Sequence, residues 1–145
     1  MEFLDVKRLG KQRIEATQIL EILLQQPILD SHNQSIVKFD KSLQMWTNHP
    51  AVKMWRGHEE WLKSYQSICI GEWCWRGYTN TIQVLKPNLI QDPPSWLGQE
   101  EFHSSHRSNL IRKNPTHYRQ FWPTESNDLE YMWPIGEKDV PENND

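Results

Sequence analysis

Basic residues followed by a carboxylate stand near the start of the chain, and their spacing suits phosphate chemistry. They are Lys7, Arg8, Lys11, Arg13 and Glu15. Residues three and four apart share one side of a helix, so Arg8, Lys11 and Glu15 fall on one face, and Gln12 joins them. That face could hold nucleic-acid phosphates beside one acid, with Gly10 allowing close backbone approach. A solvated face stabilised by a Lys11–Glu15 pair is the alternative.

Residues 48–59 combine polar side chains with aromatic surface. The candidates for contacts with bases or phosphates are Asn48, His49, Arg56 and His58. Met54 and Trp55 lie between them and are typical of a helix core. The polar members fit either a binding surface or the start of a helix, and the sequence leaves both interpretations open.

A third polar cluster occupies residues 103–113. Its candidate donors to phosphates or base edges are His106, Arg107, Asn109 and Lys113. His103 and His106 have metal-ligand spacing, but zinc needs two further ligands, and Cys69 and Cys74 have apolar neighbours. We therefore predict neither a metal nor another cofactor. An exposed helix face is the alternative interpretation of this cluster.

Three helical stretches must position these clusters. The first spans about residues 5–26 and is stopped by Pro27. The second spans residues 50–76, begins with Pro50 after a cap at Asn48 or His49, and ends at Gly77. The third spans residues 100–113, and Asn114-Pro115 restarts it through residue 121. We predict a mainly α fold, a small single-domain bundle of three principal helices with a long central helix. Residues 82–85 could form a short strand.

The chain contains eight tryptophans, an unusual aromatic content. Most of them, Trp75 included, fall on the predicted inward faces of the helices, where core packing is the default. Trp96 and Trp122 lie near loops and are the better candidates for stacking on unpaired bases.

Length and charge place further limits on function. The 145 residues suit one domain, which we assign to residues 1–135, with residues 136–145 as an acidic disordered tail. The net charge is −3, but seven acids and one base lie from Glu125 onward, which leaves 15 bases and 12 acids in residues 1–124. A nucleic-acid partner is therefore compatible with the composition. No membrane span, signal peptide or disulfide framework is evident, so we expect a cytoplasmic monomer that does not bind membranes.

Three blocks of the sequence together resemble a known family. They are LDVKRLGKQRIE at residues 4–15, NHPAVKMWRGHE at 48–59 and HRSNLIRKNPTHY at 106–118. Their order and spacing are similar to those of pyrimidine dimer DNA glycosylases of the phage endonuclease V type. The similarity is closest to uncharacterised bacterial and phage relatives and extends over residues 4–134.

The resemblance implies a metal-free enzyme that acts on damaged or modified double-stranded DNA. In the family an N-terminal amine attacks the sugar C1′, a Schiff base replaces the base, and β-elimination cleaves the strand. The amine would here be that of Met1, and the assisting glutamate on the first helix falls on Glu15. Arg8, Lys11 and Arg13 would hold the phosphates of a bent duplex.

The sequence departs from the family pattern at two places. Members carry a longer stretch ahead of the first block, which displaces the Met1 amine from the expected position. A DNA-binding arginine one turn after the glutamate is replaced by Gln18, so dimer specificity is not implied. Two hypotheses follow, a glycosylase with abasic-site lyase activity on damaged or modified pyrimidines and a non-catalytic nucleic-acid-binding module on the same scaffold.

Overall fold

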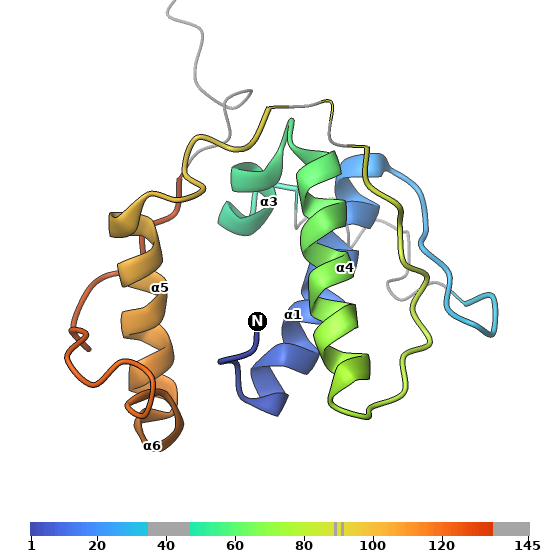
Figure 1. The fold of residues 1–145 in the computed structure, drawn as a ribbon. Coiled ribbons are helices and arrows are strands. Elements are labelled where there is room, and N and C mark those ends of the chain that lie inside the picture. Colours follow the sequence, from blue (N-terminus) through green and yellow to red (C-terminus); the bar gives the residue numbers. More distant parts are fainter. Residues whose placement is uncertain (35–46, 89, 91, 135–145) are drawn as a thin grey trace, which may run out of the picture.

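A computed structural model describes residues 1–34, 47–88, 90 and 92–134 of the chain. The helices are α1 (Val6–Leu24), α3 (Pro50–Trp55), α4 (Glu59–Trp75), α5 (Glu100–Lys113) and α6 (Pro115–Tyr118), as Figure 1 shows. The prediction of a mainly helical fold with three principal helices is confirmed by α1, α4 and α5. Within the described ranges the expected strand at 82–85 is reduced to one antiparallel bridge between Asp30 and Ile82.

Helix α1 forms where the sequence predicts it, one residue later at its start and two residues earlier at its end. Gln25 adopts a left-handed conformation with φ of 53°, and its N–H donates to the carbonyl of Glu21. That geometry terminates the helix before Pro27 is reached. Gly10 serves packing against α4, because a Cβ there would lie 3.1 Å from the Trp73 ring.

The prediction of a single long helix over residues 50–76 is wrong, because the first helix ends at Trp55. Gly57 has φ of +87°, which a helix cannot contain and which glycine adopts without strain. The Gly57 N–H donates to Glu59 Oε1 over 3.1 Å, so the first residue of α4 fixes the turn. The result is a short α3, with the predicted cap at His49 and Pro50 in its first turn, followed by α4.

Helices α1 and α4 pack against each other, and α3 and the start of α5 close one end of their shared core. Met54 and Trp55 are buried in it, as predicted. Trp96 is buried as well, at 5% exposure, so its assignment as an exposed stacking residue is wrong. Its indole donates to the carbonyl of Met54 over 3.0 Å. Trp75 is 84% exposed, although it was expected to face inward.

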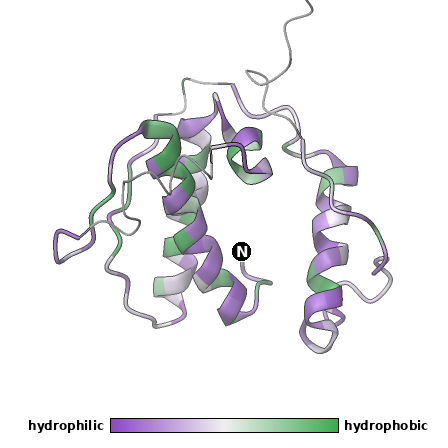
Figure 2. Ribbon diagram, turned by 180° about the vertical axis from the view of Figure 1, so that it is seen from behind, coloured by the Kyte–Doolittle hydropathy of each residue, from purple (hydrophilic) through white to green (hydrophobic). Residues whose placement is uncertain are grey.

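Helix α5 carries mostly hydrophilic residues, as Figure 2 shows, and it ends at Asn114, which also caps the start of α6. The Asn114 side chain accepts from the N–H of His117, which confirms the predicted restart. Helix α6 ends at Tyr118, and a turn replaces the predicted helix up to residue 121. Trp122 is half-buried and stacks on Tyr118 with an interplanar angle of 4°, so it does not present an open platform.

Two remaining predictions concern the limits of the folded part. None of the helices in the described ranges combines the length and the apolar content that crossing a membrane requires. The predicted acidic tail, residues 136–145, lies outside the described residues.

Candidate active site

The first five residues of the chain lie between α4 and α6. On the α4 side, Cys69 Sγ lies 3.8 Å from Met1 Sδ, and the Arg76 guanidinium donates to the carbonyl oxygens of Met1 and Glu2. On the α6 side, the Phe3 ring lies against residues 121 and 122. The N-terminus is thus held beside α4 and faces the space toward α5, as Figure 1 shows.

A chain of side-chain contacts joins the N-terminus to Glu15. The charge of the N-terminal amine lowers the pKa of the Cys69 thiol, and so does a hydrogen bond between this thiol and Tyr65. The Tyr65 hydroxyl donates to Gln12 Oε1 over 2.8 Å, and Gln12 Nε2 donates to Glu15 Oε2 over 3.1 Å. Met1 and Glu15, 14 positions apart in the sequence, are therefore linked through side chains of α4 and α1.

Burial keeps the two groups in the middle of this chain neutral. It raises the pKa of the Cys69 thiol to about 11, although the Tyr65 hydrogen bond and the nearby amine oppose the rise. Burial also raises the pKa of Tyr65 well above its ordinary value, with Cys69 and the Glu15 carboxylate adding to the effect. Tyr65 is therefore uncharged at neutral pH and acts as a hydrogen-bond donor to Gln12.

The exposed side of α1 next to this site carries positive charge. Arg8, Lys11, Gln12 and Glu15 share it, and we call them the α1 polar face. Lys11 is exposed, and Arg8 donates to Asp5 Oδ2 over 3.1 Å. Burial alone would raise the pKa of Asp5, but hydrogen bonds from Tyr118 and Arg8 hold it below its usual value, so the Arg8–Asp5 pair stays charged.

Arg13 lies on a different side of α1 from the α1 polar face. Its guanidinium donates to Asn80 Oδ1 over 2.8 Å and sits 4.5 Å from the centre of the Trp73 ring. Burial lowers the pKa of Arg13, which is typical of a cation packed into the fold. In the structure Arg13 holds the connection after α4 against α1.

The polar residues predicted around α3 occupy separate positions. His49 caps α3 by accepting from the Ala51 N–H, and Arg56 donates to the carbonyl of Thr47 over 2.8 Å. His58 is 5% exposed and its Nδ1 lies 3.1 Å from the carbonyl oxygen of Asp92. Asn48 is exposed ahead of α3. His58 therefore ties the start of α4 to the connection before α5.

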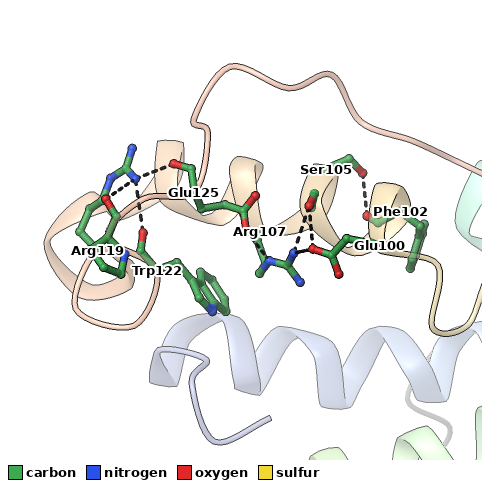
Figure 3. Close-up of polar contacts among 9 residues, drawn as sticks. Glu100, Phe102, Ser105, Arg107, Arg119, Trp122 and Glu125 are labelled. Atoms are coloured by element: carbon green, nitrogen blue, oxygen red, sulfur yellow. Dashed lines mark hydrogen bonds and ion pairs between the residues drawn. The ribbon is translucent and has the colours of Figure 1, made fainter.

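Arg107 lies between two carboxylates of its own chain. Its guanidinium pairs with Glu100 and, over 2.8 Å, with Glu125, as Figure 3 shows. Partial burial would lower the pKa of Arg107, but these two partners raise it above its usual value. The arginine joins the first turn of α5 to the segment after α6. Contact with a DNA phosphate would require Arg107 to exchange one of these partners.

His106 and Asn109 lie one turn apart on α5 and both face the segment after α6. The His106 ring packs against Phe102, Tyr131 and Trp133, with ring centres 4.4 to 5.4 Å apart. The Asn109 side chain donates to the Tyr131 hydroxyl. Lys113 is exposed at the last turn of the helix. Of this cluster, Lys113 is the side chain most open to solvent.

The burial of His106 predicts a pH dependence of stability. Burial lowers the pKa of His106 below 6.5, so the unfolded chain binds its proton more readily than the folded protein does. The free energy of unfolding should therefore fall as the pH drops through the ordinary histidine range toward the lowered value. Denaturant titrations between about pH 7.5 and pH 5.5 should show this fall, and His106→Gln should reduce it. His32→Gln, at an exposed position, is the control, and equal pH dependence in both variants would contradict the prediction.

Two metal-ligand candidates from the sequence are engaged elsewhere. His103 Nε2 accepts from the Gly98 N–H over 2.9 Å, and the His106 ring is packed as described above. In the described ranges no three His, Cys, Asp or Glu side chains gather as a possible metal site. Cys69 and Cys74 are free thiols.

Sequence reasoning missed the residues that hold the N-terminus in place. Cys69 was considered only as a metal ligand, Tyr65 and Arg76 were given no role, and Tyr118 was noted only as part of a motif. Each acts through a partner more than 50 positions away. The sequence held no specific signal for them, because α4 also carries other polar side chains, including Glu60, Lys63 and Gln66.

Fold and site together define a class, a helical protein whose first residues pack between α4 and α6 beside a helix face that carries basic residues. Residues 1–85, more than half of the chain, match the model of the family described as pyrimidine dimer DNA glycosylase, and the chain belongs to this family. The family resemblance found in the sequence is thereby confirmed over residues 1–85, and the block at residues 106–118 lies outside this match. The comparisons with curated proteins and with solved structures give no match.

Proposed function

We propose that the protein is a DNA N-glycosylase with associated abasic-site lyase activity on damaged or modified pyrimidines. Family membership supports the reaction class. The observation that carries the proposal is the run of contacts from Met1 through Cys69, Tyr65 and Gln12 to Glu15. These contacts support a shared site for the Met1 amine and the Glu15 carboxylate.

The chemistry begins with the neutral amine of Met1. Its lone pair attacks C1′, the glycosidic C–N bond breaks with its electrons going to the base, and the base leaves after gaining a proton. Opening of the sugar ring at O4′ converts the aminal to an imine. Loss of a proton from C2′ then expels the 3′ phosphate by β-elimination, which cleaves the strand.

Glu15 has two roles in these reaction steps. As a carboxylate it stabilises positive charge at C1′ while the base departs, and it accepts and returns protons at O4′ and C2′. Gln12 and Tyr65 fix its orientation through the hydrogen bonds described above. Because a mutual position within a few tenths of an ångström matters for such steps, this support is part of the catalytic arrangement.

The α1 polar face supplies the contacts to DNA. Lys11 is free to approach a phosphate, and Arg8 lies one turn before it. Extrusion of the target nucleotide costs a few kcal/mol and costs less at a damaged pair, which favours lesions over normal DNA.

The second candidate is a nucleic-acid-binding module without catalysis. Arg107 is held by two carboxylates, Arg13 by Asn80 and Trp73, and Arg8 by Asp5. Lys11, which is exposed, is then the most accessible cation of the α1 polar face for such a module. Such a module would bind DNA with strong salt dependence and form no covalent intermediate.

Borohydride trapping on ultraviolet-irradiated and on abasic duplex DNA tests the proposal. We expect a covalent protein–DNA complex, because borohydride reduces the imine to a stable amine. Digestion at basic residues and mass spectrometry should then find the sugar adduct on the peptide of residues 1–7. Salt-sensitive binding without any adduct would favour the binding module, and an adduct on Lys7 or Lys11 would contradict the role of the N-terminal amine.

A further inference from the structure

We propose that Arg76, His117 and Tyr118 form a clamp that positions the N-terminal amine for attack. This inference rests on the proposed function and adds positioning residues to it. Two of the three clamp residues belong to α6, beyond the part of the chain that matches the family model. The clamp would give this part of the chain an indirect role in the reaction, through the position of the amine.

The α6 side of the clamp holds residues 3 and 5. His117 Nε2 lies 2.7 Å from the carbonyl oxygen of Phe3, close enough for a direct hydrogen bond. The Tyr118 hydroxyl accepts from the N–H of Asp5 over 3.1 Å and donates to the Asp5 carboxylate. Tyr118 is fully buried and stacked on Trp122, so its hydroxyl is a fixed point for the start of α1.

The α4 side holds residues 1 and 2. Arg76 Nη2 lies 3.3 Å from the Met1 carbonyl and 3.1 Å from the Glu2 carbonyl, and its Nε pairs with Glu72 over 2.9 Å. The pair with Glu72 restricts the guanidinium to one orientation. With both sides in place, the backbone of residues 1–5 is bound at four positions and cannot swing away from Cys69 and Tyr65.

Positioning of this kind matters because imine formation needs the nitrogen lone pair aligned on C1′. A displacement of about 1 Å can slow such a step by about 100-fold. None of the clamp residues has to touch the substrate for this effect, so they are positioning residues. Loss of the clamp should slow the maximal rate and leave the DNA affinity, which depends on the α1 polar face, unchanged.

Tyr118→Phe and Arg76→Gln test the two sides separately. Tyr118→Phe keeps the ring that stacks on Trp122 and removes only the hydroxyl. At saturating abasic DNA we expect each variant to form the trapped complex about 10- to 100-fold more slowly than the unaltered protein, with an unchanged half-saturating DNA concentration. Arg76→Lys should recover part of the rate, because a lysine can still donate to the carbonyl oxygens.

A second measurement, amide hydrogen exchange, tests the clamp independently of catalysis. The amide proton of Asp5, which donates to the Tyr118 hydroxyl, should exchange with solvent faster in Tyr118→Phe, while amides in the middle of α4 keep their exchange rates. Arg112→Gln is the matched control, because Arg112 donates to the carbonyls of Asn127 and Leu129 in the segment after α6. It should leave the trapping rate unchanged.

The outcomes separate this inference from the proposed function. Faster exchange at Asp5 with an unaltered trapping rate overturns the clamp and leaves the glycosylase in place. A weaker DNA affinity at an unaltered maximal rate overturns the clamp as well. Absence of trapping by the unaltered protein overturns both. If Tyr118→Phe does not fold, Arg76→Gln at the surface of α4 decides the question alone.

Discussion

Glu15→Gln should reduce borohydride-trapped complex by about 10²- to 10⁴-fold, the range that a general acid–base group contributes. Gln has the shape of Glu and can still accept from Gln12 Nε2, so the fold of α1 and the Tyr65–Gln12 contact are retained. The change removes the negative charge that stabilises C1′ and the group that moves protons. The loss should appear in the rate at saturating DNA in single-turnover experiments.

DNA affinity should respond in the opposite direction. Removal of one negative charge from the α1 polar face lessens repulsion of the phosphates, so Glu15→Gln should bind at least as tightly as the unaltered protein. A variant that binds DNA and does not trap it would separate recognition from chemistry.

Glu101→Gln is the control for this experiment. Glu101 is exposed in the first turn of α5, so its replacement makes the same change in net charge away from the site. Its trapping rate should match that of the unaltered protein. Equal rates in Glu15→Gln and Glu101→Gln would remove Glu15 from the mechanism.

Much of the fold could be predicted because the signals that set it are local. Pro50, Asn114 and Pro115 mark helix starts through capping and a fixed φ, and the structure has helices beginning there. The break at Gly57 could not be predicted in this way. Glycine is tolerated inside a helix at modest cost, and its φ of +87° depends on the contact with Glu59 and on packing around α3.

In the candidate site, too, some features follow from local sequence and others depend on distant contacts. Helical spacing alone placed Arg8, Lys11, Gln12 and Glu15 on one face. Whether a polar side chain is available for DNA depends on partners that spacing does not reveal. Arg13 meets Asn80 across 67 positions, His58 meets Asp92 across 34 and Arg107 meets Glu125 across 18. Each contact forms only when separate segments fold against each other.

The second prediction with a large expected effect concerns Trp96, which is buried. The indole lies between two helices, with ring centres 4.9 Å from Trp55 on α3 and 4.8 Å from Phe102 on α5. Its N–H donates to the carbonyl of Met54. Trp96→Ala removes this whole side chain from the core and leaves a cavity together with an unpaired carbonyl. We expect a loss of about 3–5 kcal/mol in the free energy of unfolding.

Trp75→Ala provides the matched control, because Trp75 is 84% exposed and the substitution is chemically identical. An exposed position away from such contacts changes stability by less than about 0.5 kcal/mol. Since a whole domain is stable by about 5–15 kcal/mol, Trp96→Ala should lower the denaturant midpoint strongly while Trp75→Ala leaves it in place. Similar midpoints for the two variants would mean that α5 is held to α1 and α3 by other contacts.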